Sequence, residues 1–172
     1  RALALLEKAS VPDLPTIATT LNDLGLLYAM QRRYAEAEPY YRRSLEITER
    51  LQGPDRPELA KAVGDLASLY ANEGRYAEAA QLYQRSVAIV ERAYGAGHAE
   101  VARALLPLAS LEARQGRPAD AERIYQQAVA LLEKAGGVNS PAVLDVKLDL
   151  ALLQAEQGNR GAAESLYRWG IS

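Results

Sequence analysis

The only histidine of the chain, His98, is the first residue to consider as a catalytic base or a metal ligand, because the chain contains no cysteine. A histidine that acts as a general base needs a nucleophile and an orienting group, and a metal site needs several ligands. His98 stands among glycine and alanine residues, and Arg56 and Ser140 occupy its position in the other copies of the repeat described below. We therefore expect a loop residue just before a helix, and we expect no metal and no cofactor.

Paired carboxylates could act as a general acid and base, and the chain has them at Glu36 and Glu38 and again at Asp120 and Glu122. Basic residues stand near each pair, a pattern that favours a solvated, charged helix face. The two adjacent glycines at 136–137 follow a predicted helix instead of opening one, so we do not expect them to bind phosphate. The sequence therefore predicts no catalytic residue and a protein that is not an enzyme.

Composition excludes two classes of partner. The chain has 172 residues, of which 49% are hydrophobic and 24% are charged, and its formal net charge is −2. A nucleic-acid-binding domain normally shows a basic stripe, so we expect no nucleic-acid partner. No apolar run approaches the roughly 20 residues of a membrane-spanning helix, so we expect no membrane contact.

The N-terminal end of the sequence leads to two expectations about context. The first residue is Arg1 and no signal peptide is visible, so we expect the chain to be a segment of a larger protein. A cytoplasmic location is the expectation, and periplasmic and secreted locations stay open.

An internal repeat of 42 residues organises the sequence. Residues 18–59 align with residues 60–101 at 19 identities in 42 positions without a gap. The string ALALLEKA at residues 2–9 matches AVALLEKA at residues 128–135 at seven of eight positions. We therefore predict a single array with these parts: the second half of a preceding repeat (1–17), three whole repeats (18–59, 60–101 and 102–143) and a truncated fourth (144–172).

Residues that recur at this period lie three and four positions apart within each half-repeat, which predicts two amphipathic helices per repeat and an all-α fold. The recurring core columns are Leu24, Leu66, Leu108 and Leu150; Leu27, Leu69, Leu111 and Leu153; Ala37, Ala79, Ala121 and Ala163; Tyr41, Tyr83, Tyr125 and Tyr167; and Ser44, Ser86, Ala128 and Gly170. Tight turns are expected within the hairpins at residues 32–33, 74–75, 116–117 and 158–159, the last three with glycine, and Pro57, Pro118 and Pro141 are expected to open helices.

This order of leucine, small residue, tyrosine, alanine and tyrosine resembles the tetratricopeptide repeat, whose usual period is 34 residues. The strings LNDLGLLY at residues 21–28 and RYAEAEPYY at residues 33–41 resemble the kinesin light chain subtype, which also occurs in bacterial multidomain proteins. The resemblance implies a right-handed α–α superhelix of antiparallel hairpins. It also implies a protein or peptide partner, bound in a concave groove that the first helix of each repeat lines.

Two columns depart from the family pattern. They read Asn22, Gly64, Leu106 and Leu148, where the family has asparagine, and Tyr28, Tyr70, Glu112 and Gln154. We interpret both changes as a loss of groove residues from the later repeats.

The predicted concave face consists mainly of polar and charged residues. The candidate peptide-binding residues are Asn22, Asp23, Lys61, Asp65, Ser68, Asn72, Arg103, Ser110, Arg114 and Asp149. Basic residues occupy the middle of this face and acidic residues its C-terminal end, so the expected ligand is an extended peptide with an acidic centre and a basic end. Binding should be weak, since exposed ion pairs contribute only about 0–1 kcal/mol each.

Two other functions stay open at this point. The array could be a structural spacer or self-assembling rod, or it could regulate an enzyme whose catalytic domain lies outside this chain. The repeat pattern still runs at both ends, without the polar capping helix that ends natural arrays. End-to-end self-association is therefore a further expectation.

Overall fold

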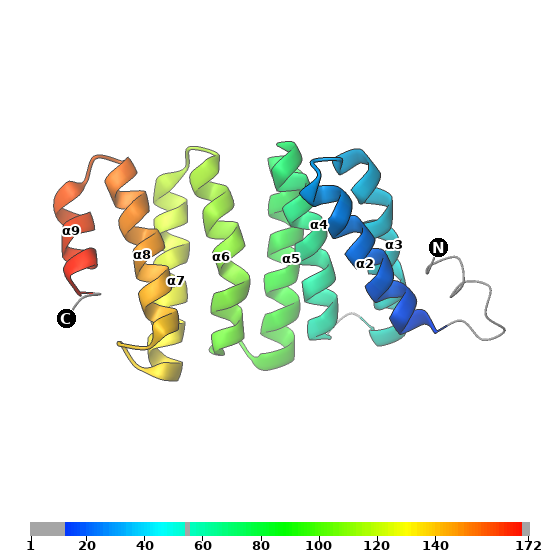
Figure 1. Ribbon diagram of the computed structural model, residues 1–172. Coiled ribbons are helices and arrows are strands. Elements are labelled where there is room, and N and C mark those ends of the chain that lie inside the picture. Colours follow the sequence, from blue (N-terminus) through cyan, green and yellow to red (C-terminus); the bar gives the residue numbers. More distant parts are fainter. Residues whose placement is uncertain (1–12, 54–55, 170–172) are drawn as a thin grey trace. The chain divides into compact units, whose positions relative to one another are not determined.

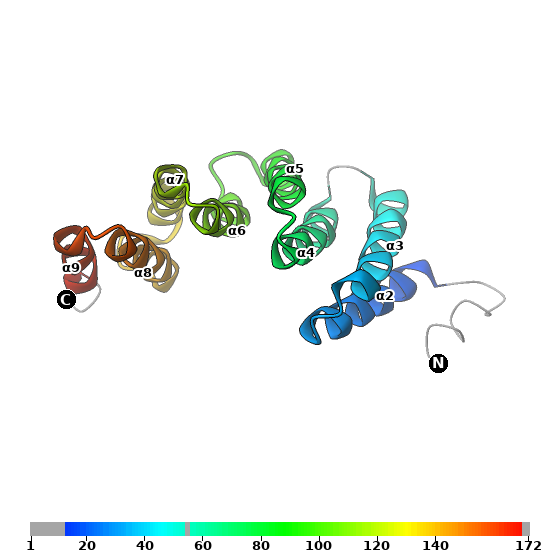
Figure 2. The same ribbon diagram turned by 90° about the horizontal axis from the view of Figure 1, so that it is seen from above.

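The computed structural model describes residues 13–53 and 56–169, and these residues form eight α-helices and no strand. The helices are α2 (Leu14–Met30), α3 (Tyr34–Gln52), α4 (Pro57–Glu73), α5 (Tyr76–Tyr94), α6 (Ala99–Arg114), α7 (Pro118–Gly136), α8 (Pro141–Glu156) and α9 (Arg160–Trp169). Successive helices pair as antiparallel hairpins, α2–α3, α4–α5, α6–α7 and α8–α9 (Figure 1, Figure 2). The predicted all-α array of hairpins is confirmed. The sequence match at residues 2–9 lies outside the described residues. So does Gly170, the last member of the column of small residues that consists of Ser44, Ser86, Ala128 and Gly170 (the small column).

Helix starts follow the signals in the sequence. Pro57, Pro118 and Pro141 each begin a helix, at a position where the missing N–H would have had no partner within the helix. His98 precedes α6, and its Nδ1 accepts a hydrogen bond from the backbone N–H of Glu100 at 3.2 Å. The prediction of a loop residue just before a helix is confirmed for His98.

The turns inside the hairpins share one left-handed residue at the same repeat position. Gly74, Gly116 and Gly158 have φ of 83°, 71° and 81°. The equivalent residue in the first hairpin is Arg32, with φ 60°. This conformation costs a residue with a Cβ more than it costs glycine, so the first turn is the strained one of the four.

The chain divides into two compact units, Arg1–Ala93 and Tyr94–Ser172. In the N-terminal unit, α2 packs on α3 and α3 on α4, and residues such as Leu21, Leu59 and Val63 are almost fully buried. The serines of the small column link the two helices of a hairpin by hydrogen bonds. Ser44 Oγ on α3 donates to the backbone carbonyl of Ala18 on α2 at 2.7 Å. The same bond recurs one period later between α5 and α4.

In the C-terminal unit, α7 packs between α6 and α8, and α8 packs on α9. Ala121 and Ala128 have no exposed surface, so the alanine columns let neighbouring helices approach closely. Lys147 occupies a column that holds Leu21 and Val63 in the N-terminal unit, and its Nζ lies 2.8 Å from Oε1 of Glu133 on α7. An ion pair between helices thus replaces an apolar contact. No described helix is long and apolar enough to cross a membrane.

One core prediction is wrong. Leu69, Leu111 and Leu153 are at most 5% exposed, but Leu27 in the same column is 53% exposed. Within the N-terminal unit α4 packs on the helix before it, α3, whereas α2 has no helix before it in the described part of the chain. Within each unit, Leu69 of α4 and Leu153 of α8 therefore lie on helices that pack on the helix before them, whereas Leu27 does not.

Candidate functional site

A hollow of about 340 Å³ opens between the two hairpins of the N-terminal unit. Helices α2 and α4, the first helices of their hairpins, form its sides, and α3 forms its floor. This N-terminal hollow is lined by Pro15, Ala18, Thr19, Asn22, Asp23, Ser44, Thr48, Leu51, Glu58, Lys61, Ala62 and Asp65.

The floor of the N-terminal hollow is polar, but its hydroxyl protons are already used. Ser44 donates to the Ala18 carbonyl, and Thr48 Oγ1 donates to the Ser44 carbonyl at 2.8 Å. The short side chains of Ala18 and Ala62 leave the space above the floor open. A bound group would therefore meet methyl groups and hydroxyl lone pairs on the floor, and it would find its hydrogen-bond donors on the sides.

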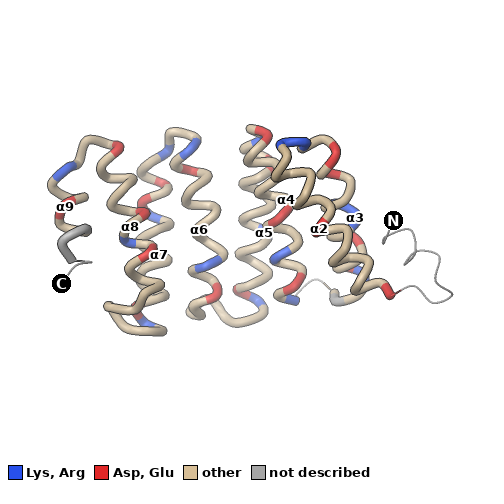
Figure 3. The backbone as a smooth tube through the Cα atoms, in the orientation of Figure 1, with Lys and Arg blue, Asp and Glu red and all other residues tan. Residues whose placement is uncertain are grey.

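Four ionisable side chains line the N-terminal hollow, and their negative charges outnumber their positive charges. On α4, Lys61 Nζ lies 3.0 Å from Asp65 Oδ2. Within the described part of the chain, Asp23 on α2 and Glu58 on α4 form no ion pair. Three carboxylates and one ammonium group leave a net charge of −2 at neutral pH. Figure 3 shows acidic and basic residues mixed along α4, with no continuous basic stripe on the coloured helices.

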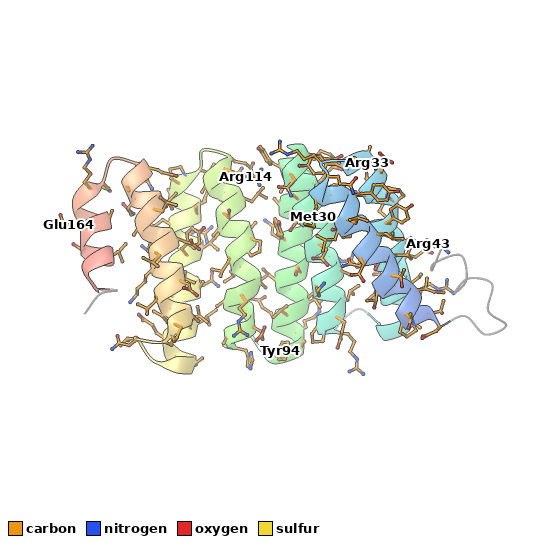
Figure 4. All side chains as sticks on the ribbon, viewed as in Figure 1. Met30, Arg33, Arg43, Tyr94, Arg114 and Glu164 are labelled. Carbon is orange, nitrogen blue, oxygen red and sulfur yellow. The ribbon has the colours of Figure 1, made fainter. Side chains whose placement is uncertain are left out.

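The C-terminal unit has a smaller hollow of about 270 Å³ among α6, α7 and α8. This C-terminal hollow is lined by Ser110, Ala113, Arg114, Tyr125, Asp149, Leu152, Leu153 and Glu156. Arg114 lies at the end of α6 next to the hairpin turn (Figure 4). Partial burial, and then the nearby charge of Asp145, raise the pKa of the Asp149 carboxyl above its usual value.

A tyrosine and an aspartate recur together in both units. Burial, followed by the charge of Asp65, raises the pKa of Tyr41 to about 12. Burial, followed by the charges of Asp149 and Glu156, raises the pKa of Tyr125 to about 12 as well. Asp65 and Asp149 lie two periods apart, as do the tyrosines, so the repeat places the same acid beside the same buried phenol twice.

The structure divides the predicted binding residues between the two units. The N-terminal hollow is lined by Asn22, Asp23, Lys61 and Asp65, and the C-terminal hollow by Ser110, Arg114 and Asp149. Ser68, Asn72 and Arg103 line neither hollow. Ser68 Oγ lies 2.9 Å from the Tyr83 hydroxyl, and Arg103 pairs with Glu100 on its own helix. A binding role for these ten residues stays a prediction.

Sequence reasoning missed several lining residues. Thr48 and Tyr125 belong to second helices, whereas the first helix of each repeat was expected to line the groove. Glu58 follows Pro57, and its position suggested only a helix start. Only the small column could have indicated these residues in the sequence. A short side chain at Ser44 leaves part of the second helix uncovered, and that part faces the hollow.

The carboxylate pair on α3 has two different structural roles. Glu36 forms an ion pair with Arg33 at 2.5 Å, and that hydrogen bond is the main reason that the pKa of Glu36 is lowered. Glu38 accepts a hydrogen bond from the Tyr70 hydroxyl at 2.8 Å and pairs with Arg75 at 3.2 Å, so it links α3 to the next hairpin. Among the described residues, no group of three or more His, Asp or Glu side chains could hold a metal ion.

The column that begins with Tyr28 makes contacts across the hairpin turns, and its interpretation as a groove feature stays a prediction. Each member contacts the residue five positions later, across the hairpin turn: Tyr28 with Arg33, Tyr70 with Arg75, Glu112 with Arg117 and Gln154 with Asn159. The first two contacts are cation–π contacts with 4.6 and 3.7 Å to the ring centre, the third is an ion pair of 2.5 Å, and the fourth is a hydrogen bond of 2.9 Å. The two residues change together, and the contact is kept.

Comparison with known proteins identifies the repeat. A family model described as tetratricopeptide repeat matches residues 1–50, 16–92, 59–134 and 100–172. No curated protein sequence matches the chain.

Solved structures show the same fold at low sequence identity. BtubC (BKLC) from P. vanneervenii is 18% identical with a TM-score of 0.81, over 99% of this chain and 68% of that chain. Nearly identical TPR-like repeats of a Podosopora anserina protein described as a kinesin light chain are 22% identical with a TM-score of 0.79, over 96% of this chain and 79% of that chain. A glutamine-to-methionine variant of those repeats is 21% identical with a TM-score of 0.82, over 98% of this chain and 80% of that chain. At these identities the likeness shows the fold, an all-α superhelical repeat.

Proposed function

The chain belongs to the tetratricopeptide repeat family, and we propose that it is a non-catalytic interaction segment that binds an extended peptide in its N-terminal hollow. Members of this family generally mediate protein–protein interactions and are typically scaffolds instead of enzymes. The observation that carries the proposal is the hollow itself, an open space of about 340 Å³ between successive hairpins with polar sides and small residues at its base.

Asn22 supports a peptide ligand. Within the described residues its amide has no hydrogen-bond partner, and a primary amide can both donate to and accept from a peptide main chain. The methyl groups of Ala18 and Ala62 leave room for that main chain to lie close to the floor. Recognition of an extended segment through its backbone, with side-chain pockets for specificity, is a common mode of peptide binding.

The test is selection of peptides from a random displayed library on the whole chain, followed by variants of the hollow. Thr19 is exposed and lines the hollow, so Thr19→Trp should obstruct it and weaken the selected peptides at least tenfold. Glu46→Trp, on an exposed position of α3 outside the hollow, is the matched control and should leave affinity unchanged. Loss of binding in the control alone would place the binding surface on the second helices and reject the proposal.

Exposed apolar residues at the end of α2 favour a second function, end-to-end association of two copies. Leu26, Leu27 and Met30 are 50%, 53% and 76% exposed, and Figure 4 shows Met30 at the end of α2. Contiguous exposed apolar side chains often mark interaction surfaces. Light scattering over a concentration series tests this function: association should rise with concentration and disappear in Leu27→Glu.

A further inference from the structure

We infer that the N-terminal hollow selects a basic peptide, with two lysine or arginine side chains placed to meet Asp23 and Glu58. The inference rests on the proposed function, because it names the chemistry of the ligand for the same hollow. It replaces the expected ligand with an acidic centre, since that expectation depended on the positive charges of Lys61, Arg103 and Arg114, of which only Lys61 lines this hollow.

The ion pairs of the described residues decide the sign of the ligand. Lys61 pairs with Asp65 at 3.0 Å, and Arg103 pairs with Glu100, so the positive charge of each is already offset by a carboxylate on its own helix. Asp23 and Glu58 have no such pair within the described part. An acidic ligand would bring further negative charge to two uncompensated carboxylates, whereas a basic ligand would neutralise both.

The placement of the carboxylates indicates the spacing of the ligand charges. Asp23 on α2 and Asp65 on α4 lie one period apart, so they occupy the same level of their helices. Glu58 lies seven residues before Asp65 on α4, a rise of roughly 10 Å along the helix. An extended chain advances about 3.3 Å per residue, so two basic side chains about three residues apart can reach both carboxylates.

The other lining residues fit a peptide better than a small cation. A divalent ion requires several converging oxygen ligands, and no three acidic side chains of the described residues are placed to share one. The two free carboxylates come from opposite sides of a hollow of about 340 Å³. Asn22 lies next to Asp23 and can hold the main chain of a peptide whose basic side chains reach outward to the two acids.

Fluorescence anisotropy with defined probes tests the inference on the whole chain. The probes are three short labelled peptides of alanine and serine that differ only in two positions three residues apart, which hold lysine, glutamate or serine. We expect the lysine peptide to bind roughly three- to tenfold tighter than the serine peptide, the glutamate peptide to bind most weakly, and the difference to shrink as salt rises.

Charge-neutralising variants locate the effect. Asp23→Asn with Glu58→Gln should remove the preference for the lysine peptide, and Glu46→Gln, the same change on an exposed position outside the hollow, should keep it. Equal affinities for all three peptides in the unchanged chain, or a preference for glutamate, would overturn the basic ligand. In that case, the proposed function still stands if the three labelled peptides compete with the library-selected peptides and if Thr19→Trp weakens binding of the library-selected peptides. If the lysine preference survives the double variant, the hollow is not its origin and the inference is wrong.

Discussion

The two units have their hollows at different positions of the repeat. Thr48 and Ala62 line the N-terminal hollow, and the residues two periods later are Leu132 and Val146, which are buried at 5% and 1% exposure. Larger apolar side chains thus stand at these positions in the C-terminal unit, and its hollow lies toward the hairpin turns, around Arg114. The comparison indicates that the size of a few side chains on the first and second helices affects where a hollow forms within the repeat.

The largest expected effect compares two leucines of one column. Leu69→Ala should lower the free energy of unfolding by roughly 2–5 kcal/mol, because the side chain is 1% exposed and its removal leaves a cavity. Leu27→Ala, one period earlier, should cost less than about 1 kcal/mol, because that side chain is 53% exposed. Urea denaturation followed by circular dichroism measures both. Equal losses would mean that Leu27 is covered in solution.

A transplant between the units tests the origin of the N-terminal hollow. Thr48→Leu with Ala62→Val introduces the residues of the C-terminal unit and should weaken hollow-bound peptides at least tenfold, about 1.4 kcal/mol. Thr48→Val removes the hydroxyl but adds little volume, so it should keep most of the affinity. Calorimetric titration provides the measurement, and thermal denaturation checks that both variants fold. Unchanged affinity in the transplant would show that volume at these positions does not control binding.

The tyrosine–aspartate pairs should make the stability of the two units fall in the same way at high pH. The pKa values of Tyr41 and Tyr125 are raised to about 12 in the folded chain, from about 10 in the unfolded chain. Their contribution to stability is therefore complete below pH 10 and is lost as the pH rises through 12. Replacing either tyrosine by phenylalanine should reduce the loss of stability between pH 10 and 12 by about 1 kcal/mol, measured by denaturant titration at each pH. If only one of the two phenylalanine variants reduces this loss of stability, the two tyrosines do not have the same raised pKa.

The smallest expected effect concerns the first hairpin turn. Arg32→Gly should stabilise the N-terminal unit by about 0.5–1 kcal/mol, because glycine adopts the left-handed conformation at little cost. Gly74→Ala, at the equivalent turn, should destabilise by about 1 kcal/mol for the same reason. Hydrogen exchange of the two turns distinguishes local effects from global ones. A destabilised Arg32→Gly variant would show that contacts of the Arg32 side chain outweigh its backbone strain.

The sequence predicted the hairpins well because their signals are local. Pro57 begins a helix because its fixed φ and missing N–H suit the first helical position, an effect that acts within one turn. The alanine and tyrosine columns predicted burial at Ala79 and Tyr83, because a helical period places them on one face. Of the predicted binding residues, Asn22 and Lys61 do line a hollow, and their binding role stays a prediction.

By itself, the sequence determined the repeat, the two helices in each copy and most of the buried face, because these depend on spacing along one chain. Only the tertiary structure decided that Leu27 is exposed, that Glu38 pairs with Arg75 of the next hairpin, and that Tyr70 contacts Arg75 across a turn. Each of these depends on which side chain of another helix or turn lies within a few ångströms. The spacing of residues along one helix determines which side chains share a face. Which of those side chains stay exposed, and which of their charges stay unpaired, depends on the neighbours that pack against that face.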